Sequence, residues 1–176
     1  MDRRRLALIF GNEDYSGTAK LKSCVKDADD LAVALTNLDF QCTKYHNLNK
    51  RAMDIAIRDF CAIIADNDCI LIYFSGHGME ACPAFGKALT SHVNIPQESQ
   101  FALIFSSDPG TVSYVGDESG NSFFTSALLN HLATPKLEID GMMKLVRKEM
   151  LQTSLGQQRP WIHSCLTEDF YFNQGL

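Results

Sequence analysis

The chain has 176 residues, of which 45% are hydrophobic and 21% charged, with a net charge of −5 at pH 7. This length and composition predict one soluble globular domain with a substantial core. The negative charge, without a basic patch interleaved with aromatic residues, argues against nucleic-acid binding. No apolar run approaches the roughly 18 residues of a membrane span or forms a signal-peptide core, so we expect no membrane contact and a cytoplasmic protein.

The six cysteines contain no C-x-x-C pair. This spacing predicts no zinc site, and the length and regular patterning of the chain argue against a disulfide scaffold. We therefore expect a reducing compartment, which agrees with a cytoplasmic location.

The first half of the chain alternates strand and helix patterns. Apolar runs predict strands over 6–10, 40–45 and 69–74, and apolar residues at helical spacing predict helices over 25–38 and 49–65. Asn49 is the expected N-cap of the second helix, whose buried stripe includes Ile63 and Ile64. This alternation predicts a parallel sheet with helices packed on its faces.

The second half of the chain is less regular. Strands are expected over 101–105 and 111–114, a helix beginning at Ser122 or Thr125 and ending near 132, and another helix over 139–151. A final extended segment is expected over 160–172. No repeat or linker divides the chain, so we expect a single domain.

A histidine between two glycines follows the strand pattern over 69–74 and Ser75. The strand is apolar on both faces, which predicts full burial, and open α/β sheets place their chemistry at the carboxyl ends of such strands. His77 there is suited to general acid/base work near neutral pH. A lone histidine more often only ends a strand, but Gly76, Gly78 and the thiol of Cys82 favour a nucleophile–base pair.

These residues resemble a known family. Ser75-Gly76-His77-Gly78 resembles the catalytic-histidine motif of the caspase-like cysteine peptidases (caspases, metacaspases and paracaspases), and Ala81-Cys82 resembles their nucleophile motif, with Glu80 in its acidic position. Further segments that resemble the family lie at 21–28, 108–114, 121–132 and 160–172. The resemblance is closest in character to the paracaspase and metacaspase type.

The resemblance implies an α/β fold, a caspase-like three-layer sandwich with a mostly parallel central sheet and helices on both faces. It covers residues 1–176 as one domain, with 1–80 similar to the large subunit and 81–176 to the small subunit. It implies a cysteine endopeptidase in which the Cys82 thiolate attacks a peptide carbonyl and His77 protonates the leaving amine. The backbone N–H groups of Gly78 and Cys82 would form the oxyanion hole.

The resemblance also implies a substrate preference. Asp27 matches an aspartate that in metacaspases and paracaspases helps to bind a basic side chain, and Glu80 would assist it. The alternative for Asp27 is an ordinary acidic residue in the first turn of a helix, where negative charge is favourable. The implied partners are a protein or peptide substrate and a second copy of the chain, paired through the edge strand near the carboxyl end. No metal or other cofactor is implied, and calcium dependence is left open.

The sequence departs from the family between its two catalytic motifs. Only four residues separate His77 from Cys82, whereas neighbouring parallel strands need a crossover of about a dozen residues or more. A block that contains the crossover helix and a central strand is therefore missing near Glu80 and Ala81, through an incomplete sequence, a splicing or gene-model deletion, or evolutionary loss. Either the strand at 101–105 moves beside the His77 strand, or the domain is only marginally stable.

Two functions follow from these observations. One is an active cysteine endopeptidase, and the other is a catalytically impaired caspase-like domain that acts as a regulatory or protein-binding module. A third interpretation, a nucleotide-binding α/β domain, is disfavoured because no glycine-rich phosphate loop follows the first strand.

Overall fold

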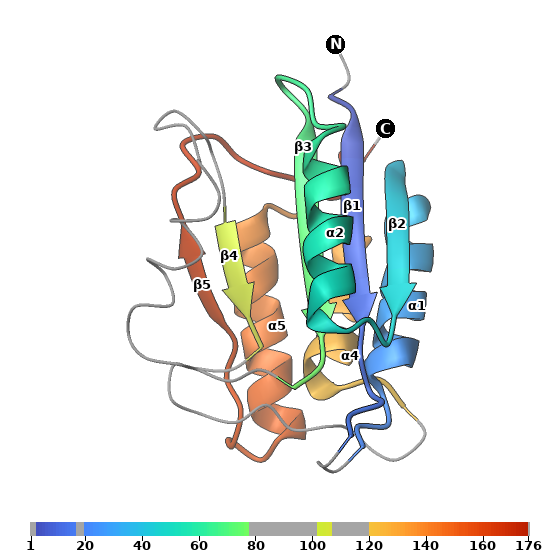
Figure 1. Ribbon diagram of the computed structural model, residues 1–176. Helices are drawn as coiled ribbons and strands as arrows, with labels where there is room; N and C mark the ends of the chain where they lie inside the picture. Colours follow the sequence, from blue (N-terminus) through green and yellow to red (C-terminus); the bar gives the residue numbers. More distant parts are fainter. Residues whose placement is uncertain (1–2, 17–19, 78–101, 107–119, 176) are drawn as a thin grey trace.

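The computed structural model describes residues 3–16, 20–77, 102–106 and 120–175. Four helices and five strands lie within these ranges (Figure 1). In chain order they are β1 (Arg5–Gly11), α1 (Cys24–Thr36), β2 (Phe40–His46), α2 (Lys50–Cys61), β3 (Cys69–Ser75), β4 (Ala102–Phe105), α4 (Phe123–Leu132), α5 (Ile139–Thr153) and β5 (Trp161–Ser164). The predicted strand over 111–114 lies outside the described residues.

The main sheet has the order β2-β1-β3, with all three strands parallel. Arg5 at the start of β1 is aligned with Phe40 and Cys69, and Gly11 at its end is aligned with His46 and Ser75. The three carboxyl ends therefore meet at one edge of the sheet, as the strand–helix alternation predicted.

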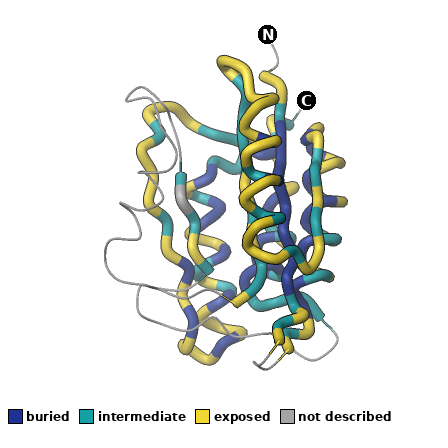
Figure 2. Tube along the Cα trace, viewed as in Figure 1, coloured by how far each residue is buried: buried dark blue, intermediate teal, exposed yellow. Residues whose placement is uncertain are grey.

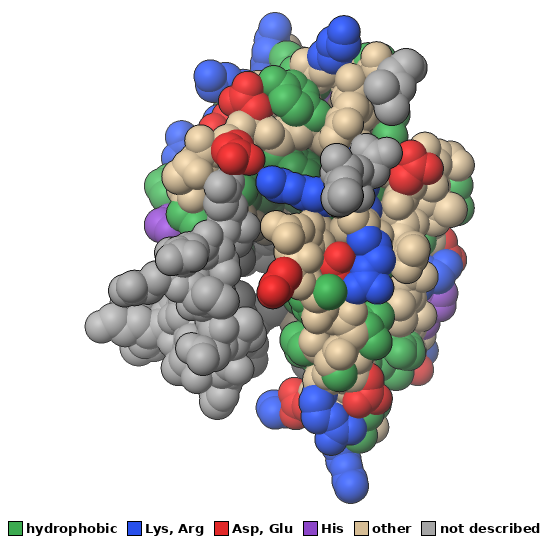
Figure 3. Space-filling model, turned by 90° about the horizontal axis from the view of Figure 1, so that it is seen from above, with side chains coloured by type: hydrophobic (Ala, Val, Ile, Leu, Met, Phe, Trp, Pro, Cys, Tyr) green, Lys and Arg blue, Asp and Glu red, His purple; other side chains and the backbone are tan. Residues whose placement is uncertain are grey.

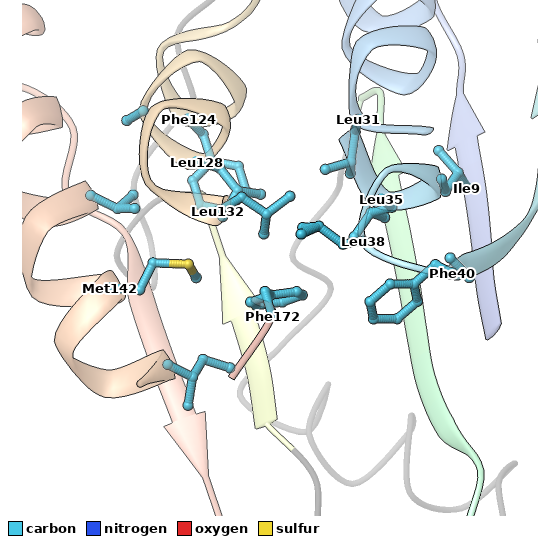
Figure 4. Packing of buried hydrophobic residues seen from close by; sticks show 14 of the residues in the cluster. Ile9, Leu31, Leu35, Leu38, Phe40, Phe124, Leu128, Leu132, Met142 and Phe172 are labelled. Carbon is cyan, nitrogen blue, oxygen red and sulfur yellow. The ribbon is translucent and has the colours of Figure 1, made fainter. Parts of the chain in front are cut away.

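Helices cover both faces of β1, so its side chains alternate between two cores. Ala7 and Ile9 belong to a large cluster with α1, α4 and α5, part of which Figure 4 shows. Leu6, Leu8 and Phe10 face the opposite way and pack against α2. Burial of a large apolar side chain contributes about 1.5–3 kcal/mol, and β1 is buried along most of its length (Figure 2). The predicted α/β sandwich with helices on both faces is confirmed.

A second sheet contains only β4 and β5, which are antiparallel, with Ala102 opposite Ser164 and Phe105 opposite Trp161. Within the described part of the chain, β4 does not pair with β3. Both sheets nevertheless contribute side chains to the large cluster, including Tyr73 of β3 and Ile104 of β4. Side-chain packing therefore joins the two sheets, and β4 has not moved into a ladder with β3.

The prediction that β3 is buried on both faces is wrong. The side chains of Ile72 and Phe74 are 55% and 42% exposed. They alternate with Leu71 and Tyr73, which pack against the large cluster on the other face. Because β3 lies at the edge of the described three-stranded sheet, it lacks the second neighbour that a central strand would have.

The second predicted helix ends earlier than expected, at Cys61. The chain leaves the helix in a tight turn, in which the N–H of Ile63 donates to the carbonyl of Phe60 at 3.2 Å. Ile63 and Ile64 are consequently exposed and do not extend the buried stripe. The N-cap prediction is confirmed, because the Asn49 side chain accepts a hydrogen bond from the N–H of Ala52.

The carboxyl-terminal segment returns to the start of β1. The Arg5 guanidinium donates to the carbonyl oxygens of Leu38 at 3.2 Å, Tyr171 at 2.9 Å and Phe172 at 2.6 Å. It also lies over the rings of Phe40 and Phe170, at 5.3 and 5.9 Å from their centroids. Arg5 thus fixes the last described residues against the first strand.

The end of the molecule where β1 begins carries mixed charge. Figure 3, seen from this end, shows Lys and Arg side chains interspersed with Asp and Glu. One pair consists of Arg4 and Asp68, with 2.5 Å between the guanidinium Nη2 and the carboxylate Oδ2. No helix in the described ranges has the length and apolar character needed to cross a bilayer.

Candidate active site

His77 lies just beyond the carboxyl end of β3 and is exposed. The neighbouring strand continues to hold the backbone here, because the N–H of Asn12 donates to the carbonyl of Ser75 at 2.8 Å. An imidazole at this edge is accessible to a ligand while its backbone is anchored to a sheet. This is the location that the sequence predicted for His77.

Asp27 lies in the first turn of α1, and its side chain is completely buried. One carboxylate oxygen accepts a hydrogen bond from the Ser75 hydroxyl at 3.0 Å, and the other accepts one from the backbone N–H of Ser122 at 2.8 Å. Desolvation raises the pKa of Asp27, and these hydrogen bonds oppose the shift. Asp27 therefore links α1, the end of the His77-bearing strand and the start of α4.

A chain of hydroxyl groups extends this link into the interior. The Tyr73 hydroxyl lies 2.6 Å from Oγ1 of Thr125, which accepts a hydrogen bond from the Ser122 hydroxyl at 3.0 Å. Burial raises the pKa of Tyr73, so its hydroxyl remains neutral. The Ser122 side chain also accepts from the N–H of Thr125, as expected for an N-cap. The network fixes β3 relative to α4 just behind His77.

The negative charge of Asp27 is not balanced by an ion pair with any Lys, Arg or His in the described residues. A buried carboxylate without a cationic partner is costly.

The structure brings His77 and Asp27 to the same edge of the sheet, but it does not place the rest of the predicted site. Gly78, Glu80 and Cys82 lie outside the described residues, as does the segment at 108–114. Within the described ranges, no cluster of three or more His, Cys, Asp or Glu side chains is arranged to hold a metal ion.

Two residues at this edge were not predicted from the sequence. The Tyr15 hydroxyl accepts a hydrogen bond from the backbone N–H of His77 at 3.0 Å, and their rings meet edge to face. Cys24 is buried, and desolvation raises the pKa of its thiol, which disfavours the nucleophilic thiolate form. Tyr15 follows β1, and side chains after parallel strands gather at the carboxyl edge of a sheet; this is the signal that could have identified it.

Comparisons with known proteins point to one family. The family model described as Caspase domain matches residues 4–88 and 84–171. The chain is 30% identical over 92 residues to human mucosa-associated lymphoid tissue lymphoma translocation protein 1, covering 52% of this chain and 11% of that protein. It is 42% identical over 59 residues to caspase a of Danio rerio, covering 33% of this chain and 15% of the relative.

The chain therefore spans only a small part of the length of these relatives. The crystal structure of caspase-1 from Spodoptera frugiperda superposes with a TM-score of 0.75 at 18% identity, covering 98% of this chain and 92% of that chain. This similarity shows the fold. With a family model that matches most of its length, the chain belongs to the caspase domain family.

Proposed function

We propose that this domain is a cysteine endopeptidase that uses a His77–Cys82 dyad and cleaves after a basic residue. The observation that carries the proposal is the position of His77, exposed at the carboxyl end of β3, two residues after the serine that donates to the buried Asp27 carboxylate. The caspase domain match supports the reaction class, which is hydrolysis of a peptide bond in a protein substrate.

The reaction consists of two acyl-transfer steps. The Cys82 thiolate attacks the scissile carbonyl, and the N–H groups of Gly78 and Cys82 stabilise the oxyanion. His77 gives a proton to the leaving amine as the C–N bond breaks. The amine departs, and the carbonyl carbon stays bonded to the sulfur of Cys82 as a thioester. His77 then takes a proton from water as the water attacks the thioester, and the carboxylic acid product leaves with Cys82 restored.

The preference for a basic residue is assigned to Asp27, with Glu80 as a second carboxylate. Asp27 is buried and carries no ion pair within the described ranges, so a substrate Arg or Lys would gain a charge-assisted hydrogen bond there. An acidic substrate residue would instead meet a like charge in a desolvated site.

Hydrolysis of fluorogenic peptides tests both parts of the proposal. We expect turnover of peptides with Arg or Lys before the scissile bond, and loss of that turnover in Cys82→Ala and His77→Ala. Asp27→Asn should reduce the preference for Arg over a neutral residue. Asp29→Asn is the matched control, because Asp29 lies on the same helix but is only half-buried and is paired with Lys44. Turnover that persists without Cys82 would contradict the proposal.

A second candidate function is a catalytically impaired domain that acts as a regulatory or protein-binding module. It is favoured by the four-residue separation of His77 from Cys82 and by the lack of a ladder between β3 and β4 among the described residues. Intact mass after treatment with an arginine-based electrophile distinguishes the two functions. A single adduct that Cys82→Ala abolishes supports the peptidase, whereas a folded protein without an adduct supports the module.

Three further expectations belong to this proposal. Residues 1–80 and 81–176 correspond to the large and small subunits of the family. Among the described residues, Cys24, Cys42, Cys61 and Cys69 are free thiols, which supports the reducing environment of the cytoplasm. Pairing of two copies through the edge of β5 is expected to give a homodimer, and sedimentation measures it.

A further inference from the structure

Tyr15 and His77 make two separate contacts across the carboxyl edge of the sheet. The Tyr15 hydroxyl accepts the hydrogen bond of the His77 backbone N–H at 3.0 Å. The ring centroids are 4.7 Å apart with 63° between the ring planes, an edge-to-face arrangement that aromatic rings prefer. We propose that Tyr15 is a positioning residue that sets both the backbone and the ring orientation of His77.

The segment that carries Tyr15 is itself held in place. The Asn47 side chain accepts hydrogen bonds from the N–H groups of Glu13 and Asp14, at 3.0 and 3.1 Å. The carbonyl of Glu13 also accepts from the N–H of Leu21 at 3.2 Å. Because its two preceding residues are anchored to the end of β2, Tyr15 is a fixed support for His77.

The glycine before His77 gives an independent observation. A Cβ at Gly76 would lie 2.5 Å from the Tyr15 hydroxyl oxygen and 2.6 Å from Cζ of Phe74. The hydroxyl therefore reaches the strand end only because residue 76 has no side chain. The glycine of the Gly-His motif thus makes room for Tyr15 in this chain.

The chemistry of the hydroxyl suits a permanent contact. Burial raises the pKa of Tyr15, although the hydrogen bond from His77 opposes the shift. The phenol therefore remains neutral at physiological pH, and its contact with the His77 N–H does not change with titration of the hydroxyl. A general acid/base must present the correct ring nitrogen to the reacting group, and small misplacements reduce the rate. This role rests on the proposed function of His77.

The two contacts can be separated by substitution. Tyr15→Phe keeps the ring and removes the acceptor of the His77 N–H, whereas Tyr15→Leu removes both. Tyr45→Phe is the control, because Tyr45 stacks on Phe10 in the opposite core. Thermal unfolding establishes that each variant is folded before it is compared.

Activity-independent measurements test the contacts directly. We expect faster hydrogen exchange of the His77 amide in Tyr15→Phe. In Tyr15→Leu we expect displaced NMR resonances of the His77 ring, which are assigned as those absent from the spectrum of His77→Gln. Tyr45→Phe should change neither. His77 ring resonances that stay in place in Tyr15→Leu would overturn the inference, whether or not the protein is active.

Kinetics test the consequence for catalysis. For Cys82-dependent turnover, we expect kcat to fall about three- to tenfold in Tyr15→Phe and about ten- to hundredfold in Tyr15→Leu, with KM unchanged. A raised KM at constant kcat would overturn the positioning role, since it would place Tyr15 in substrate binding. If the unsubstituted domain shows no Cys82-dependent turnover, the proposed function fails, and the resonance and exchange data alone decide whether Tyr15 positions His77.

Discussion

The contacts of Arg5 predict a large loss of stability when this residue is replaced by methionine. Arg5→Met keeps the apolar stem but removes three hydrogen bonds to carbonyl oxygens and two cation–π contacts. Such hydrogen bonds contribute about 1 kcal/mol each, and partly exposed cation–π contacts about 0.5–1 kcal/mol each. Because one side chain makes all of them, the contributions are not additive, and we expect a loss of about 2–4 kcal/mol.

A loss of this size is measurable against a typical domain stability of about 5–15 kcal/mol. Equilibrium urea unfolding gives the free energy, followed by circular dichroism and by the fluorescence of the single tryptophan, Trp161. Arg3→Met is the matched control, because Arg3 is exposed and its pair with Glu168 spans 3.6 Å, so its loss should cost less than about 0.5 kcal/mol. The loss of unfolding free energy in Arg5→Lys should lie between those of Arg3→Met and Arg5→Met, since an ammonium lacks the planar fork of donors.

A loss of stability in Arg5→Met that is no larger than the loss in Arg3→Met would refute the predicted role of Arg5. That result would mean that the carboxyl-terminal segment does not depend on Arg5 for its attachment to the first strand. An unchanged denaturant slope is required for the comparison, since a changed slope would indicate a different unfolded state.

Three further predictions concern stability. Gly11→Ala should lower the free energy of unfolding by about 1–3 kcal/mol in urea, because the new Cβ would clash with the backbone oxygen of Cys24. Gly141→Ala is the control and should not destabilise the domain, because its Cβ would make only an ordinary contact at 3.4 Å. Equal losses in the two variants would contradict the prediction. Asn49→Ala should lower the unfolding free energy by about 1 kcal/mol through loss of the α2 cap, and an unchanged value would exclude that cap as a stabilising contact. Burial raises the pKa of Asp27 in the folded state, so the stabilisation that this carboxyl contributes is fully present below its unfolded pKa of about 3.9 and is lost as pH rises through the folded pKa. The free energy of unfolding of the natural chain, relative to that of Asp27→Asn, should therefore fall across this pH window by at most about 1.4 kcal/mol per pH unit. Urea unfolding over a pH series measures this difference, and a rise would refute the prediction.

Local patterns in the sequence were sufficient for much of the fold. The parallel strands and the helices that flank them follow from apolar periodicity, and the cap at Asn49 follows from side-chain chemistry. For α4 the sequence left Ser122 and Thr125 as alternative starts, and the structure has Ser122 as the cap. The position of His77 at the sheet edge follows from the same reasoning, because a strand pattern ends immediately before it.

The features that were not predicted depend on partners distant in sequence. The exposure of Ile72 and Phe74 reflects which strand lies beside β3, and periodicity within one strand carries no information about its neighbours. The contact of Tyr15 with His77 and that of Asp27 with Ser122 likewise join separate segments of the chain. The resemblance supplied a role for Asp27 but not the donors that surround it.

The shared core behind the two sheets has a consequence for how this domain tolerates change. Its halves are joined by interlocking apolar side chains on α1, α4 and α5, without a continuous ladder of backbone bonds across the described strands. The entropy of closing a connecting loop varies only slowly with its length. The number of residues between β3 and β4 can therefore change during evolution while the shared apolar core persists.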